Sequence, residues 1–131
     1  MTVKAILESK GHDVFTLGPN EPLSEAIRIL SEHRVGALVV TNGDRKIVGI
    51  ISERDIVRVV AAGSDPNAVR AGDVASTKLV WTGAEDTVDS VANRMMEHYI
   101  RHVLVEQDGT LVGVVSARDL LGAYSSGAGE P

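Results

Sequence analysis

The sequence predicts an α/β (α+β) protein made of two copies of one strand-helix-strand-strand-helix unit. Three observations predict it: the chain repeats itself at a spacing of 65 residues, each copy holds Val- and Ile-rich runs bounded by turns, and helical periodicity precedes and follows those runs. A copy of about 60 residues buries little surface alone. We therefore expect the two copies to share a core.

The first strand and the first helix have the same pattern in both copies. Val14-Phe15-Thr16-Leu17 corresponds to Leu79-Val80-Trp81-Thr82, and a glycine and a polar turn follow each run. Apolar residues at helical spacing then predict a helix in each copy. These residues are Leu23, Ala26, Ile27 and Leu30 in the first copy, and Val88, Val91, Ala92, Met95, Met96 and Tyr99 in the second. We expect Met95 and Met96 to fill the core and Trp81 to pack on the strand surface.

The second and third strands of each copy form a predicted hairpin. Residues 37–40 and 47–51 match residues 103–105 and 111–115, and the second turn contains Asp108-Gly109, a strong hairpin signal. That turn is one residue shorter than the first, so the spacing between the copies becomes 64 residues. Final helices are predicted at Glu53 to Ala62 and at Ala117 to Tyr124.

The predicted domain boundaries follow from the repeat and from the breaks in its pattern. Residues 1–66 hold the first copy and the start of a linker, because Gly63-Ser64-Asp65-Pro66-Asn67 ends the helical pattern. Residues 67–124 hold the second copy. Residues 125–131 are predicted to be a disordered tail.

Composition excludes several classes of function. The net charge of −5 argues against a general nucleic-acid binder, which needs a basic excess. The sequence has no cysteine and therefore no disulfide or thiol chemistry. It has no apolar run long enough for a membrane span, and residues 1–10 lack the apolar core of a signal peptide. We expect a cytoplasmic, soluble protein that binds neither nucleic acid nor membrane.

A short motif recurs where each third strand passes into the final helix. It reads Ser52-Glu53-Arg54-Asp55 in the first copy and Ser116-Ala117-Arg118-Asp119 in the second. One interpretation is structural, because a serine N-cap and an acid at the third helical position form a capping box. The other is functional: a helix N-terminus attracts phosphate, the carboxylate can accept hydrogen bonds from a ribose diol, and the repeated arginine adds a cation. The two interpretations are compatible.

The repeated Gly-hydrophobic-hydrophobic-Ser-x-Arg-Asp pattern resembles the signature of cystathionine-β-synthase-type (CBS) domains. The resemblance covers about residues 1–124 and is to a stand-alone tandem pair, also called a Bateman module. It implies two β-α-β-β-α repeats packed with internal pseudo-twofold symmetry. It also implies a regulatory protein that binds AMP, ADP or ATP, with NAD(H) and S-adenosylmethionine as alternatives, with or without Mg²⁺.

The resemblance also implies which residues bind the ligand. Asp55 and Asp119 would hold ribose hydroxyls, and Ser52, Ser116, Arg54 and Arg118 would lie at ribose or phosphate. Because each cleft of such a pair is completed by the opposite copy, the partners expected for Asp119 are Asp13, Phe15, Val35 and Gly36. Those expected for Asp55 are Lys78, Val80, Ile100 and Arg101, with His102 beside them as a further basic residue.

The copies differ in charge at this place, since Val35-Gly36-Ala37 in the first corresponds to Ile100-Arg101-His102 in the second. We therefore predict unequal sites, with more cations at Asp55. The alternative is that Arg101 and His102 form an exposed patch. His98 and His102 have the i, i+4 spacing of metal ligands, but His102 is predicted to start a strand, so we expect no metal site.

Three functions remain to be compared. The first is a non-enzymatic sensor of adenine nucleotides that controls an unidentified effector protein in trans as a homodimer, with the Asp55 helix (Ile56, Val57, Val59, Val60) contributing to the dimer face. The second is an enzyme, but the sequence shows no nucleophile with a base, no metal cluster and no carboxylates paired in one cleft, so we expect neither catalysis nor a catalytic cofactor. The third is a structural or protein-binding scaffold with no bound nucleotide.

Overall fold

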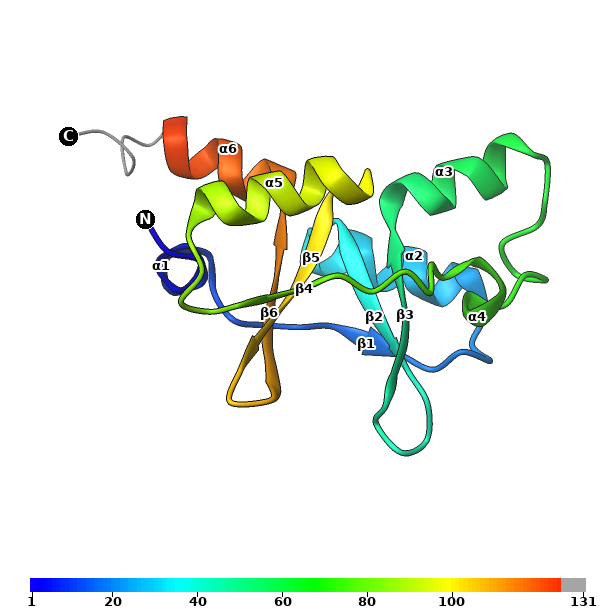
Figure 1. Ribbon diagram of the computed structural model, residues 1–131. Coiled ribbons are helices and arrows are strands. Elements are labelled where there is room, and N and C mark those ends of the chain that lie inside the picture. Colours follow the sequence, from blue (N-terminus) through cyan, green and yellow to red (C-terminus); the bar gives the residue numbers. More distant parts are fainter. Residues whose placement is uncertain (126–131) are drawn as a thin grey trace. The chain divides into compact units, whose positions relative to one another are not determined.

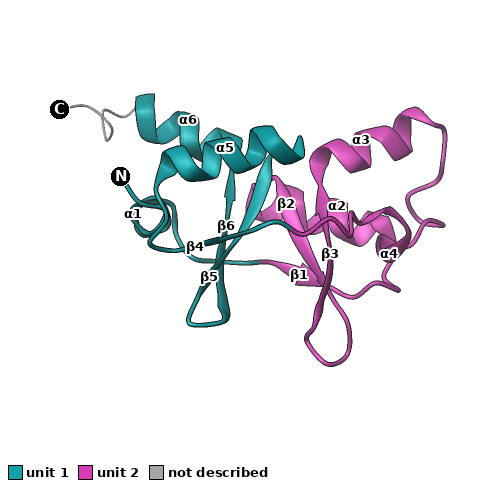
Figure 2. Ribbon diagram, in the orientation of Figure 1, with its two compact units in different colours: residues 1–14, 80–131 teal, residues 15–79 magenta. Residues whose placement is uncertain are grey.

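The computed structural model describes residues 1–125, which form two compact units (Figures 1 and 2). Unit 2 comprises residues 15–79, and unit 1 comprises residues 1–14 together with the described residues from 80 onward. Each unit contains one three-stranded sheet covered by helices, which confirms the mixed α/β fold class. The predicted tail, 125–131, lies outside the described residues except for Ser125, which ends a helix.

Unit 2 holds the first repeat. Its strands are β1 (Thr16–Leu17), β2 (Ala37–Thr41) and β3 (Ile47–Ser52), and its helices are α2 (Leu23–His33), α3 (Glu53–Ala61) and the short α4 (Ala71–Val74). β1 and β2 pair in parallel, and β2 and β3 form the antiparallel hairpin. The core of the unit lies between the sheet and the helices, where Leu23, Leu38 and Ile51 are fully buried.

Unit 1 holds the second repeat and the start of the chain. It contains α1 (Val3–Lys10), β4 (Trp81–Gly83), α5 (Val88–His98), β5 (His102–Gln107), β6 (Thr110–Ser116) and α6 (Ala117–Ser125). α1 contacts both β6 and α6 (Figure 1). Its apolar residues Val3, Ile6 and Leu7 have the spacing of one helix face, and all three are buried in the core of this unit.

The predicted repeat is present element by element. α5 begins and ends 65 residues after α2, and α6 does so 64 residues after α3. The change of spacing falls in the second hairpin, whose two-residue loop of Asp108 and Gly109 has φ values of 54° and 78°. Positive φ at both positions is what a tight hairpin loop requires, so the predicted Asp-Gly turn is confirmed.

Three local features differ from the predicted pattern. Helices α1 and α4 were not predicted, and the first strands are shorter than the apolar runs that suggested them. Met95 is 7% exposed, as predicted, but Met96 is 76% exposed, so its predicted place in the core is wrong. Neighbouring residues of a helix point about 100° apart, and only one of the two methionines can face the sheet. None of the helices in residues 1–125 is long and apolar enough to cross a membrane.

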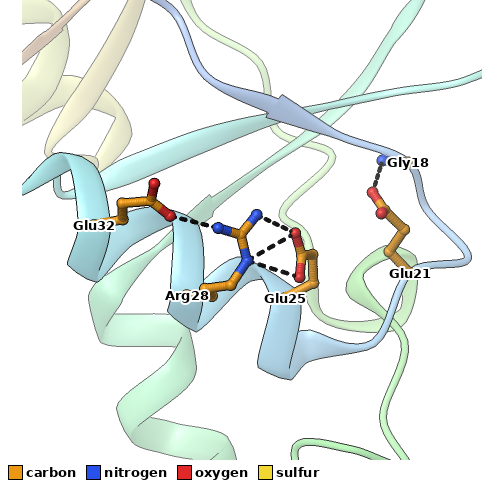
Figure 3. Close-up of polar contacts among 5 residues, drawn as sticks. All are labelled: Gly18, Glu21, Glu25, Arg28 and Glu32. Carbon is orange, nitrogen blue, oxygen red and sulfur yellow. Dashed lines mark hydrogen bonds and ion pairs between the residues drawn. The ribbon is translucent and has the colours of Figure 1, made fainter.

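The exposed side of α2 carries a set of ion pairs (Figure 3). Arg28 donates to Glu25 one turn before it and to Glu32 one turn after it, the spacing at which helical side chains meet. The hydrogen bonds from Arg28 lower the pKa of Glu25 below its ordinary value. Glu21 accepts a hydrogen bond of 2.8 Å from the Gly18 amide and so closes the turn before the helix.

Candidate functional site

The motif of unit 2 lies where β3 ends and α3 begins. The Ser52 amide donates to Oδ2 of Asp55 at 2.8 Å, and the Asp55 amide donates to Oγ of Ser52 at 3.4 Å. The Ser52 hydroxyl also donates to Oδ2 of Asp55 at 3.1 Å. The predicted capping box is therefore confirmed, and it holds the Asp55 carboxylate at the end of the strand.

The motif of unit 1 has the same reciprocal bonds. The Ser116 amide donates to Oδ2 of Asp119 at 2.8 Å, and the Asp119 amide donates to Oγ of Ser116 at 3.1 Å. Here a third group joins them, because Nζ of Lys10 lies 2.7 Å from the same Oδ2 atom. The carboxylate of the second motif is thus half of an ion pair.

Each motif lies beside the start of the second strand of its own unit. The Glu53 amide donates to the Gly36 carbonyl at 3.0 Å, and the Ala117 amide donates to the Arg101 carbonyl at 2.8 Å. Together with the capping serine, these carbonyls satisfy two of the first three N–H groups of each final helix. Fewer donors are left for a phosphate than an uncapped helix N-terminus offers.

The charged side chains of the motifs differ in exposure. The side chains of Asp55 and Asp119 are 20% and 19% exposed, so both are held by the protein and remain partly in contact with solvent. Arg54 and Arg118 are exposed. At Asp55 the nearest ion-pair partner is Arg58, whose Nη1 lies 4.0 Å from Oδ1.

The residues predicted to flank the base occupy equivalent places in the two units. Phe15 and Val80 are half-buried just before the first strand of each sheet. Their carbonyls accept from the amides of Val39 and Leu104, at 3.0 and 2.9 Å. The Phe15 ring stacks on the imidazole of His33, with the ring centres 4.0 Å apart, a contact that the sequence pattern did not suggest.

The remaining predicted residues lie on the segments that lead into the strands. Val35 and Ile100 are half-buried against the core of their own units, and His102 is half-buried at the start of β5. The side chains of Asp13, Lys78 and Arg101 are exposed. Which of these residues approach the motif of the other repeat stays a prediction.

The prediction that a strand begins at His102 is confirmed. α5 ends at His98, and His102 is the first residue of β5, so the two imidazoles do not project from one helix. Within residues 1–125, no three His, Asp or Glu side chains are grouped so that they could hold a metal ion.

Lys10 is the site residue that sequence reasoning missed. It is the last residue of α1, and its ammonium donates to the Val114 carbonyl at 2.9 Å as well as to Asp119. Val3, Ile6 and Leu7 gave a signal for the helix, since they follow helical spacing. No local signal indicates where that helix docks, because Lys10 and Asp119 are 109 residues apart.

Comparison with known proteins agrees with this duplicated arrangement. The family model described as "CBS domain" matches residues 3–62 and 71–126. The crystal structure of a CBS-domain-containing protein from Agrobacterium tumefaciens is 35% identical to this chain and has a TM-score of 0.86. The comparison covers 94% of this chain and 92% of that one.

Two further solved structures contain adenosine-based ligands. One is a CBS-domain protein from Pyrobaculum aerophilum in complex with AMP. It is 30% identical to this chain, with a TM-score of 0.79, and the comparison covers 96% of this chain and 99% of that one. The other is the CBS-domain pair of protein MJ0100 with 5′-methylthioadenosine and S-adenosyl-L-methionine. It is 26% identical to this chain, with a TM-score of 0.82, and the comparison covers 96% of this chain and 97% of that one.

Proposed function

Because the chain belongs to the CBS-domain family, we propose that it is a regulatory module that binds an adenine nucleotide at its Ser-x-Arg-Asp motifs and controls a partner protein in trans. AMP, ADP and ATP are the ligands proposed first, and NAD(H) and S-adenosylmethionine are the alternatives. The complexes of the similar proteins with AMP and with S-adenosylmethionine support an adenosine group as the shared part of the ligand.

The observation that carries the proposal is the geometry of the two carboxylates. Asp55 and Asp119 are each held by a serine amide at 2.8 Å, and each keeps about a fifth of its side chain exposed. An ionised carboxylate has about four lone-pair sites, more than the capping bonds use. One site on each oxygen can accept from one of the two vicinal hydroxyls of a ribose, so one residue both caps the helix and holds the ligand.

The phosphates of the ligand would be held by local cations. The chain as a whole has a net charge of −5, so its overall field does not attract an anion. Arg54 and Arg118 are exposed on the first turns of α3 and α6, next to the carboxylates. Arg101, Lys78 and His102 remain predicted contacts.

We also propose that the chain forms a homodimer through its final helices. Val57 and Val60 of α3 are 64% and 54% exposed, and the equivalent residues of α6, Leu121 and Tyr124, are 69% and 52% exposed. Large apolar side chains exposed at the same two positions of both repeats are typical of a surface that another protein covers. Ile56 and Val59, which were predicted to share this face, instead pack against the core of unit 2.

The test is a ligand panel on the wild-type protein and on Asp55→Ala and Asp119→Ala. AMP, ADP, ATP, NAD(H) and S-adenosylmethionine are added to nucleotide-free protein, and binding is followed by thermal shift and calorimetry. A ligand at a hundredfold its dissociation constant adds about 2.7 kcal/mol of stability, which moves the midpoint by several degrees. Each Asp variant is expected to lose the binding at its own motif.

The matched control is Thr87→Ala, which removes the N-cap of α5 without changing either motif. It should lower the midpoint about as much as the Asp variants do and leave ligand binding unchanged. If no ligand of the panel produces heat or a shift with the wild-type protein, the sensor proposal fails. The motifs are then helix caps, and the scaffold hypothesis takes its place.

A further inference from the structure

The two motif carboxylates differ in what occupies their lone pairs. Oδ2 of Asp55 accepts from the Ser52 amide and from the Ser52 hydroxyl, at 2.8 and 3.1 Å. Oδ2 of Asp119 accepts from the Ser116 amide and from the Lys10 ammonium, at 2.8 and 2.7 Å. A carboxylate oxygen accepts about two hydrogen bonds, so in both motifs Oδ2 is full before a ligand arrives.

Freeing Oδ2 for a ligand costs different amounts of free energy in the two motifs. A hydroxyl rotates freely about its C–O bond, so Ser52 can turn its hydrogen away from Asp55 and still accept from the Asp55 amide. Lys10 can leave Oδ2 of Asp119 only if two opposite charges 2.7 Å apart are separated, whereas the Ser52 hydroxyl carries no charge. A diol that needs both carboxylate oxygens therefore meets a hydrogen-bonded cation at Asp119, whereas the cation nearest Asp55, Arg58, lies 4.0 Å from Oδ1, beyond hydrogen-bond distance.

The Lys10 ammonium is held in a position where it can compete with a ligand for Asp119. Its ammonium also donates to the Val114 carbonyl at 2.9 Å, two residues before the capping serine. Val3, Ile6 and Leu7 anchor its helix in the core, and Nδ1 of His12 lies 3.2 Å from the Val112 carbonyl just beyond it. The lysine therefore stays next to Asp119 and needs no large movement to return to it.

We propose that Lys10 is a built-in competitor of the ligand's ribose diol at Asp119, so that the Asp55 motif fills first. The inference rests on the proposed function, which it deepens by assigning a regulating residue to one of the two motifs. It agrees in direction with the prediction of unequal sites but has another cause, the ion pair at Asp119 rather than extra cations at Asp55.

The experiment titrates ¹⁵N-labelled protein with adenosine, which has the diol but no charge. The amides of Ser116 and Asp119 report binding at one motif, and those of Ser52 and Asp55 report the other in the same samples. Lys10→Met should tighten adenosine binding at the Asp119 motif by roughly two- to fivefold, the effect expected of one partly exposed ion pair. The affinity at the Asp55 motif should not change.

Two further variants separate the lysine's role from general effects. Lys4→Met makes the same change on the same helix, where the ammonium lies 3.9 Å from Glu85, and should leave both affinities unchanged. Lys10→Gln keeps a donor for the Val114 carbonyl and removes the charge, so it should tighten binding at Asp119 even if the methionine variant folds poorly. 2′,3′-Dideoxyadenosine lacks the diol, and its affinity should not respond to either Lys10 variant.

Three results would overturn the inference. Adenosine could bind the Asp119 motif of the Lys10 variants equally well or more weakly, the dideoxy compound could gain as much as adenosine, or adenosine could bind no variant while AMP still binds. In each case the proposed function survives, since ligand binding at the motifs remains. Loss of both adenosine and AMP binding from every protein, wild type included, would instead overturn the proposed function and this inference with it.

Discussion

Leu7 of α1 packs directly over Gly113 of β6, so closely that a Cβ atom on Gly113 would lie 2.7 Å from Cδ2 of Leu7. Leu7 is 1% exposed and belongs to the core of unit 1, so its side chain would have to shift against packed neighbours. The contact joins the first helix of the chain to the strand that ends in Ser116.

Gly113→Ala is therefore expected to lower the free energy of unfolding by about 1–3 kcal/mol, the usual cost of an extra group in a packed core. Gly122→Ala is the matched control, because a Cβ atom at this position of α6 has no neighbour within 4 Å. It should raise stability by about 0.5–1 kcal/mol, since alanine favours a helix more than glycine does. Urea denaturation measures both changes, and equal stabilities of the two variants would contradict the packing argument.

The capping serines make a second prediction about stability. Ser52→Ala and Ser116→Ala should each cost about 1 kcal/mol, because the amides of Asp55 and Asp119 lose their acceptor. Ser31→Ala, at an exposed position inside α2, should stay within about 0.5 kcal/mol of the wild type. A loss at Ser52 or Ser116 no larger than at Ser31 would show that these caps contribute little.

Asp86 makes the stability of unit 1 depend on pH. Its Oδ2 accepts from the Thr82 hydroxyl and from the Gly83 amide, both at 2.7 Å, and Arg94 lies 3.4 Å away. These hydrogen bonds, that of Thr82 first, lower the pKa of Asp86 below its ordinary value. A lowered pKa in the folded state means that the contribution is complete above the unfolded pKa and is lost as the pH falls through the folded one.

Asp86→Ala should cost about 2 kcal/mol at pH 7, because it leaves the buried Thr82 hydroxyl without its acceptor. The cost should be constant above about pH 5 and shrink below about pH 3.9, the ordinary aspartate pKa. Chemical denaturation at a series of pH values measures it. Glu21→Ala is the control from the first repeat, where one exposed bond to Gly18 is lost, and its cost should be smaller. A cost at Asp86 that stays constant down to pH 3 would contradict the prediction.

The exposed apolar residues of the final helices predict how the chain associates. Val57→Ser combined with Val60→Ser, and separately Leu121→Ser, should shift sedimentation from dimer toward monomer, because they remove apolar area that a dimer would bury. Urea unfolding of the monomer should change little, since these side chains are exposed in the single chain. Met96→Ser alters a 76% exposed residue outside the proposed face and should leave association unchanged. If the Met96 variant dissociates and the others do not, the face is elsewhere.

The features that could be predicted from the sequence depend on neighbours in the chain. The hairpin loop of Asp108 and Gly109 requires positive φ at two adjacent positions, and the capping boxes link residues three apart. The same order of strands and helices could be predicted for both copies because the same local sequence patterns occur in each. The separation of His98 from His102 followed from where a helix had to end.

Other features needed information from distant parts of the chain. Periodicity placed Ile56, Val59 and Met96 on apolar stretches, but it did not show which side of the helix a sheet would cover. The stacking of His33 on Phe15 joins the end of α2 to the segment before β1. Neither residue's identity indicates that contact.

The sequence by itself therefore determined the repeated order of elements, the two capped helices and the pair of carboxylates at their starts, because each depends on residues a few positions apart. Only the tertiary structure decided that α1 packs on β6 and that Lys10 reaches Asp119, across 109 residues of chain. The physical reason is that burial selects docking partners by shape and apolar area, which many segments offer, whereas a turn or a cap needs particular residues at a particular spacing.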